Sequence, residues 1–178
     1  MSGFRRIAPA LLVLILAPAA AAAQAPPPDF LSEWLRQFEA SVQKLAALAE
    51  AMPADRYTWS PGEGVMPVGQ VYMHIARYNY LYPAENLGVA PPAGVTMNSM
   101  EEERDKAAVL RALSRSVAHA RAAAERMTDE DLGRTTRLYG RDVPSWSVLL
   151  QLLAHMNEHL GQSIAYARMN GIVPPWSR

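Results

Sequence analysis

Apolar residues recur at intervals of three and four along four stretches of the chain, the spacing of amphipathic helices. The first predicted helix follows Asp29, which is expected to cap it, and ends before Pro53. Its apolar positions share one face: Leu31, Leu35, Phe38, Val42, Leu45, Ala49 and Met52. Residues 53–66 are turn-rich, and their Tyr57 and Trp59 rings are expected to fold over one end of the helices because both are costly to leave in water.

The second predicted helix has Pro67 in its first turn and runs to about Tyr82. One face of it is apolar or aromatic: Val68, Val71, Ile75, Tyr78 and Tyr82. His74 falls on the flank of that face. After a connection rich in proline and glycine, Ser99 and Glu102 form a predicted capping box that opens a third helix. The third helix repeats the apolar spacing at Leu110, Leu113, Val117, Ala120, Ala124 and Met127.

The fourth predicted helix carries the most distinctive polar residues of the chain. It follows a polar connection over 128–144 with a predicted turn at Gly140, and Ser145 is expected to cap it. Gly171 and two later prolines end it. One edge of its apolar face carries polar and aromatic residues at helical spacing: His155, His159, Gln162 and Tyr166. Four amphipathic helices predict an all-α four-helix bundle.

Residues 1–23 have the pattern of a secretory signal peptide. Two arginines precede an apolar run over 7–16, and small residues lead to a predicted cleavage site after Ala23. The arginine pair permits twin-arginine export, but the strong apolar run favours export of the unfolded chain. A proline-rich tether over 24–28 then leads to one predicted domain at 29–178. We expect a periplasmic or secreted protein with no stable membrane anchor after cleavage.

Charge and cysteine content exclude several functions. The chain has 17 basic and 17 acidic residues, and cleavage would remove two arginines, leaving 15 basic against 17 acidic residues. So balanced a domain lacks the electrostatic surface that binds DNA or RNA. There is no cysteine, so an exported form has no disulfides and any metal site must use nitrogen and oxygen ligands.

His155 and His159 are spaced as a metal-binding pair. They lie one helical turn apart, about 6 Å along the axis, and both point from one face. Two imidazoles do not make a tight site, and His74 is the candidate third ligand. Unpartnered imidazoles at the edge of a core would be costly, which favours ligation. Three neutral imidazoles also leave one coordination position open, as in catalytic zinc sites. We therefore predict one divalent metal ion.

Several residues are candidates for supporting roles at this site. Glu158 and Gln162 lie beside the histidine pair and are candidate partners that fix a ring tautomer. Glu158 is also a candidate proton acceptor. Tyr78 and Tyr166 are predicted next to the histidines and are candidate pocket residues. The fourth histidine, His119, falls opposite the apolar seam of the third helix and is expected to face water.

A zinc peptidase is a minor alternative. The segment HMNEH from His155 to His159 matches the HxxEH pattern of one peptidase class, in which the glutamate, here Glu158, activates water. The match is short, the mature chain is small for that class, and no distal motif supplies its third ligand.

Two segments resemble the DinB-like superfamily of four-helix-bundle metalloproteins. They are VYMHIARYN around His74, and LLAHMNEHLGQSIAYARMNGIVPP from Leu152 to Pro175, which is similar to the family's final helix with its HxxxH, Gly-Gln and Gly-x-x-Pro-Pro. The resemblance implies that His74, His155 and His159 hold a divalent ion, usually zinc or nickel. Many relatives carry arginine just before Gly-Gln, where this chain has Leu160.

The resemblance also suggests a class of reaction. Some relatives are transferases or isomerases that join a low-molecular-weight thiol to an electrophile, so a metal-dependent transferase or hydrolase acting on a small molecule, with such a thiol as a candidate cofactor, is expected. A non-catalytic metal-binding or interaction module is the alternative from a different class. The substrate is unspecified, and a homodimer is compatible with the sequence.

Overall fold

The computed structural model describes residue 27 and residues 29–177 of the chain. The predicted signal peptide, its cleavage site and most of the tether lie outside these residues. None of the helices in the described part is long and apolar enough to span a membrane.

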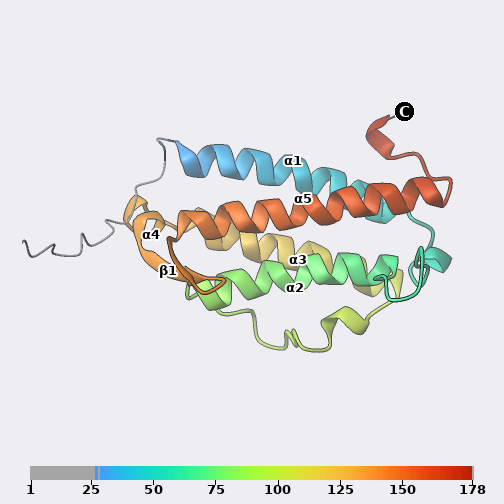
Figure 1. The fold of residues 1–178 in the computed structure, drawn as a ribbon, viewed down its shortest axis with the longest axis horizontal. Coiled ribbons are helices and arrows are strands. Elements are labelled where there is room, and N and C mark those ends of the chain that lie inside the picture. Colours follow the sequence, from blue (N-terminus) through green and yellow to red (C-terminus); the bar gives the residue numbers. More distant parts are fainter. Residues whose placement is uncertain (1–26, 28, 178) are drawn as a thin grey trace, which may run out of the picture.

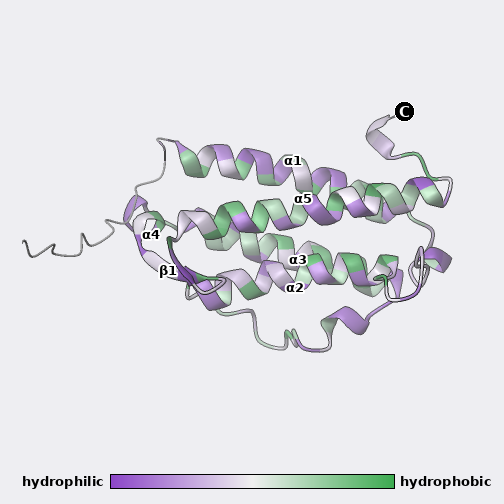
Figure 2. Cartoon of the chain, viewed as in Figure 1, coloured by the Kyte–Doolittle hydropathy of each residue, from purple (hydrophilic) through white to green (hydrophobic). Residues whose placement is uncertain are grey.

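Within these residues, four long helices form a bundle (Figure 1). They are α1 (Phe30–Ala51), α2 (Val68–Asn86), α3 (Lys106–Glu125) and α5 (Trp146–Met169). Helices α1 and α2 each contact both α3 and α5, so all four surround one core. Each long helix carries both polar and apolar residues (Figure 2). The all-α fold expected from the periodicity is confirmed.

The buried core of α1 follows the predicted seam only in part. Phe38, Leu45, Ala49 and Met52 are buried as expected, whereas Leu31, Leu35 and Val42 are only partly buried. Two buried apolar or aromatic residues of α1 lie outside the predicted seam: Leu48, and Trp34, which is only 2% exposed and donates its indole N–H to the carbonyl oxygen of Leu149 at 2.7 Å. Tyr57 is fully buried and donates its hydroxyl to the carbonyl oxygen of Ala49 at 2.8 Å. The expectation that the Tyr57 and Trp59 rings pack against the bundle is confirmed, because both belong to or contact the core.

Helix α2 is longer than predicted, because it continues beyond Tyr82 and through Pro83 to Asn86. Proline lacks the N–H that would bond the carbonyl one turn earlier. Pro83 lies in the last turn of α2 and is itself buried. The carbonyl oxygen of Pro83 accepts from the N–H groups of Leu87 and Val89, which closes the helix end. One missing bond near the end of a packed helix is therefore tolerated.

The predicted start of the third helix was wrong. Ser99 makes no side-chain cap, and the residues after it form the short helix η2 (Met100–Glu102). Helix α3 begins at Lys106, where the Asp105 carboxylate accepts the N–H of Ala108 at 2.8 Å. The Ser99 and Glu102 pattern matched a capping box by spacing alone, whereas the packing of η2 against α2 moves the helix start six residues onward.

Two further predicted caps differ in detail. Asp29 stands at the N-cap position of α1 but has left-handed backbone angles (φ 59°) and no side-chain cap bond. Ser145 stands at the N-cap position of α5, and its hydroxyl instead donates to the carbonyl oxygen of Arg134 at 2.8 Å. The helix starts were predicted correctly, but the side-chain hydrogen bonds expected at them are not formed.

Replacing Asp105 with alanine should lower the free energy of unfolding by about 0.5–2 kcal/mol, because the first turn of α3 loses its cap. Ser99→Ala is the matched control and should change it by less than about 0.5 kcal/mol. Urea unfolding monitored by circular dichroism measures both. A larger loss for Ser99→Ala than for Asp105→Ala would show that α3 is capped upstream.

The polar connection before α5 contains structure that the sequence pattern did not indicate. A short helix, α4 (Asp129–Gly133), begins with a capping box between Thr128 and Asp131. A hairpin of β1 (Thr135–Leu138) and β2 (Arg141–Pro144) follows. Its turn has positive φ at Tyr139 (49°) and Gly140 (77°), so the turn predicted at Gly140 is confirmed.

The far end of α5 matches the prediction. Gly171 has φ 74°, and the N–H of Ile172 donates to the carbonyl oxygen of Ala167 at 2.8 Å. This is the glycine-dependent termination that the sequence indicated. Helix η3 (Pro175–Ser177) follows and contacts α1. The remaining short helix, η1 (Ala54–Arg56), lies in the connection between α1 and α2.

Candidate metal centre

His74 from α2 meets His155 and His159 from α5. The ring centroids lie 5.1 Å apart for His74 and His155, 4.8 Å for His74 and His159, and 4.6 Å for His155 and His159. One nitrogen from each ring lies within 4.8 Å of the other two. Adjacent packing of α2 and α5 brings His74 to the pair that helical spacing already places together. The three histidines could therefore hold one metal ion.

The three imidazoles differ in their access to solvent. His155 and His159 are 9% and 8% exposed, while the His74 side chain is 19% exposed. The more open side of the cluster is therefore the side formed by α2. Buried imidazoles need partners, so the hydrogen bonds at each ring decide which nitrogen is free to bind a metal.

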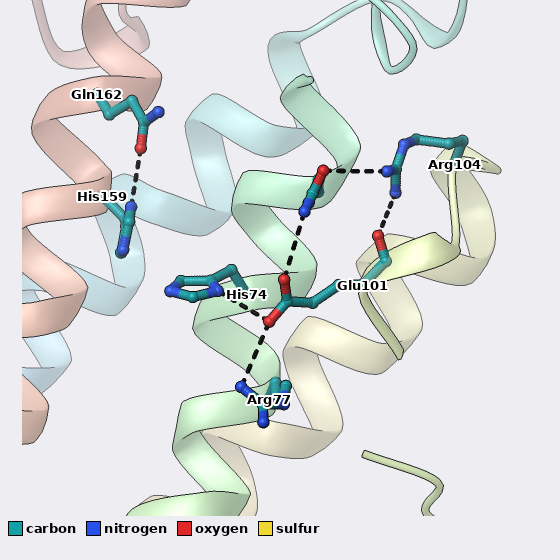
Figure 3. A network of polar contacts seen from close by, with 7 residues as sticks. His74, Arg77, Glu101, Arg104, His159 and Gln162 are labelled. Carbon is teal, nitrogen blue, oxygen red and sulfur yellow. Dashed lines mark hydrogen bonds and ion pairs between the residues drawn. The ribbon is translucent and has the colours of Figure 1, made fainter. Parts of the chain in front are cut away.

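Gln162 lies where it was expected, and it fixes the tautomer of His159. Its side-chain oxygen is 2.8 Å from Nδ1 of His159 (Figure 3). Its amide nitrogen donates to the Tyr166 hydroxyl at 2.8 Å, and that hydroxyl donates to the carbonyl oxygen of Met66 at 3.1 Å. Because this chain of bonds turns the amide oxygen toward His159, Nδ1 of His159 must be the donor. Nε2 then keeps its lone pair for a metal.

His74 is oriented by a residue that no sequence pattern indicated as part of the site. Nδ1 of His74 lies 2.8 Å from a carboxylate oxygen of Glu101 (Figure 3). A carboxylate accepts the Nδ1 proton, so Nε2 of His74 is also the free nitrogen. Glu101 lies in η2, at the end of the long connection between α2 and α3. It is the first of three consecutive glutamates, and the sequence does not distinguish it from the other two.

His155 shows that the cluster fits a metal ion. Its Nε2 atom is buried and has no hydrogen-bond partner among the described residues. Burial, together with the neighbouring His159 and His74, lowers the pKa of His155 from 6.5 to about 3. The ring is thus neutral at pH 7 and presents a lone pair where an unpartnered polar atom would be costly. A divalent ion would satisfy that atom.

Tyrosine side chains lie beside the histidine cluster. Tyr78 lies 4.7 Å from His74 and 4.3 Å from His155, measured between ring centroids. Tyr166 reaches His159 through Gln162. Both therefore lie beside the histidines as expected, while their role in a pocket stays a prediction. Tyr82 was not selected from the sequence as a site residue, yet its ring lies 6.0 Å from His155 and its hydroxyl bonds that of Tyr139.

Glu158 is exposed on α5, and its suggested role as proton acceptor stays a prediction. The histidine–carboxylate contact that the structure does contain is made by Glu101.

His119 was expected to face water, and that expectation was wrong in part. Its ring packs 5.0 Å from Tyr80, and its Nε2 atom is buried. Burial, with a smaller contribution from the charge of Arg126, lowers the pKa of His119. The error arose because the chain between α2 and α3 covers the outer face of α3 near this residue, and helical periodicity cannot show that. His119 does not belong to the metal-binding group, as predicted.

The comparison with known families agrees with this geometry. A family model described as the DinB superfamily matches residues 37–167, which include all three clustered histidines. The chain belongs to the DinB superfamily. No match was found among curated proteins.

Solved structures of DinB-like proteins share the fold. A crystal structure of a DinB-like protein from Bacillus cereus ATCC 10987 has a TM-score of 0.68 and 19% identity, covering 82% of this chain and 93% of that one. A DinB-like protein from Bacillus subtilis has a TM-score of 0.57 and 24% identity, with the same coverage. At these identities the likeness supports the DinB-like fold and leaves the reaction open.

Proposed function

We propose that this DinB-superfamily protein binds one divalent metal ion, zinc or nickel, through His74, His155 and His159, and uses it as a transferase or hydrolase on a small molecule. The observation that carries the proposal is the buried, unpartnered Nε2 of His155 beside two imidazoles whose Nδ1 atoms are already engaged. The predicted leader supports action in the periplasm or outside the cell.

The residues of the cluster suit a catalytic ion better than a structural one. Three neutral imidazoles leave the positive charge of an ion undiminished and supply three ligands. Such an ion would provide Lewis acidity toward a water or thiol nucleophile or a substrate carbonyl. Gln162 and Tyr166 hold His159 in place, while Tyr78 excludes water from the faces of His74 and His155. The greater exposure of His74 favours substrate approach from the α2 side.

A second candidate function is a non-catalytic metal-binding module. The burial of His155 and His159 favours it, because buried ligands couple metal binding to folding stability. The zinc-peptidase alternative is less well supported, because it needs Glu158 to act at the ion and that side chain is exposed.

Cobalt substitution separates the two main candidates. We expect the Co²⁺-loaded protein to show the visible absorption bands of a low-coordinate ion, and these bands should shift when azide or a small thiol is added. The shift is expected because the protein supplies three ligands and leaves a position open. His119→Ala should give the same spectra. Bands that do not respond to azide or to thiols would favour the non-catalytic module and contradict the catalytic proposal.

A further inference from the structure

We propose that Glu101 is a positioning residue of the metal site, which holds His74 in its metal-binding orientation and adds a negative charge behind it. Because the ion belongs to the proposed function, this role rests on that proposal. Glu101 lies 27 positions after His74 and reaches it from outside the two helices that carry the ligands.

The carboxylate of Glu101 is held on several sides. One oxygen lies 2.8 Å from Nδ1 of His74 and 3.6 Å from a guanidinium nitrogen of Arg77 (Figure 3). The other oxygen accepts the side-chain amide of Gln70 at 3.4 Å. Arg104 bonds both the carbonyl oxygen of Glu101, at 2.5 Å, and the Gln70 side-chain oxygen, at 3.3 Å. The oxygen facing His74 is thereby fixed in direction.

The backbone around Glu101 packs directly against α2. A Cβ atom at Gly69 would lie 3.1 Å from both Cδ of Arg104 and the carbonyl oxygen of Tyr57, and 3.3 Å from the carbonyl oxygen of Glu103. The absence of a side chain at Gly69 thus allows the segment after η2 to approach the first turn of α2. That close approach brings Glu101 within hydrogen-bond distance of His74, five residues after Gly69 on α2.

The three imidazoles are consequently not equivalent. His159 donates to a neutral amide, whereas His74 donates to a carboxylate, and a charged acceptor makes a stronger bond. His74 is also the most exposed of the three, so solvent restrains its ring less than a buried environment would. A carboxylate at Nδ1 supplies that restraint, makes Nε2 a better donor to a cation, and partly balances the charge of the ion.

If the role of Glu101 were purely structural, its replacement would affect folding stability and not metal affinity in particular. As a partly buried ion pair with Arg77, Glu101 would contribute to folding whether or not metal is present. As a positioning residue, it affects metal affinity and the His74 tautomer more than the stability of the metal-free protein. Glu102 is the matched control, because it is the next glutamate in η2 and its side chain is exposed.

The test measures Zn²⁺ affinity by competition with a chromogenic chelator, in the wild type and in Glu101→Ala, Glu101→Gln and Glu102→Ala. Glu101→Ala should raise the Kd roughly 10–100-fold, the usual effect of losing an outer-shell partner. Glu101→Gln keeps an acceptor oxygen without the charge and should fall between Glu101→Ala and the wild type. Glu102→Ala should bind like the wild type. Nitrogen-15 NMR of the metal-free protein should show the Nδ1–H tautomer of His74 in the wild type and a mixture in Glu101→Ala.

Each failure has a distinct meaning. A wild-type protein that binds no Zn²⁺ would overturn the proposed function itself. A wild type that binds Zn²⁺ while Glu101→Ala binds equally well, with an unchanged His74 tautomer, would overturn the positioning role alone. Equal losses of affinity in Glu101→Ala and Glu102→Ala, accompanied by equal falls in the melting temperature of the metal-free proteins, would assign Glu101 a structural role instead.

Discussion

Alanine at His74, His155 or His159 is expected to abolish stoichiometric binding of zinc or nickel by the purified protein. Each substitution leaves two imidazoles, and two neutral ligands do not hold a divalent ion tightly. The loss should be at least the 10–100-fold typical of outer-shell changes, because a direct ligand is removed. Elemental analysis after gel filtration, followed by equilibrium titration with Zn²⁺, measures the metal bound per chain.

His119→Ala is the matched control for these ligand variants. It also removes a partly buried imidazole, but from a site that is not part of the metal-binding cluster. It should keep the wild-type metal content. Circular dichroism at 222 nm shows whether each variant still folds, and histidine-to-asparagine variants replace any alanine variant that does not. Full metal content in a folded His74, His155 or His159 variant would contradict ligation by that residue.

The histidine cluster could be predicted because two simple rules determine it. Helical periodicity places His155 and His159 on one face and His74 at the edge of the buried face of α2. Packing of the two helices then brings those edges together. Gln162 follows from the same rule, since it lies three residues after His159 on the same helix. Each of these positions depends on local helix geometry and on one contact between two helices.

Glu101 could not be predicted by the same reasoning. Its position depends on the path of a non-helical connection, which the close approach at Gly69 and the bonds of Arg104 determine together. The sequence shows only three adjacent glutamates, and their spacing from Ser99 suggested a cap that the structure does not form. The burial of His119 was missed for a similar reason, since periodicity describes a helix face and cannot identify a loop that covers it.

The starts of α1 and α5 were predicted better than the hydrogen bonds at them. Ser145 was placed correctly before α5, but its hydroxyl is used by the carbonyl of Arg134, which belongs to the preceding connection. That connection forms α4 and a hairpin in which Leu138 alone of the β1 residues is buried. Its mostly polar composition gave no alternating pattern long enough to indicate strands.

Trp34 is where the core departs most from the predicted seam of α1, and replacing it should have the largest effect on stability. Its ring stacks on Phe38 with centroids 4.7 Å apart, and its indole N–H donates to the carbonyl oxygen of Leu149 in the first turn of α5. Trp34→Ala should lower the free energy of unfolding by about 3–5 kcal/mol, because it removes a fully packed ring and leaves a cavity between α1 and α5. Urea unfolding of the metal-free protein measures the change.

Two further variants show which part of Trp34 is responsible. Trp34→Phe keeps an aromatic ring but loses the N–H, and a net hydrogen bond contributes only about 0.5–1.5 kcal/mol, so its effect should be clearly smaller than that of alanine. Trp176→Ala removes a tryptophan that is 39% exposed in η3 and should destabilise least. If Trp34→Ala and Trp176→Ala were equally destabilising, the ring of Trp34 would not be filling the space between α1 and α5. An equal loss in Trp34→Phe and Trp34→Ala would instead assign most of the stability to the bond with Leu149, because phenylalanine retains much of the ring packing that alanine removes.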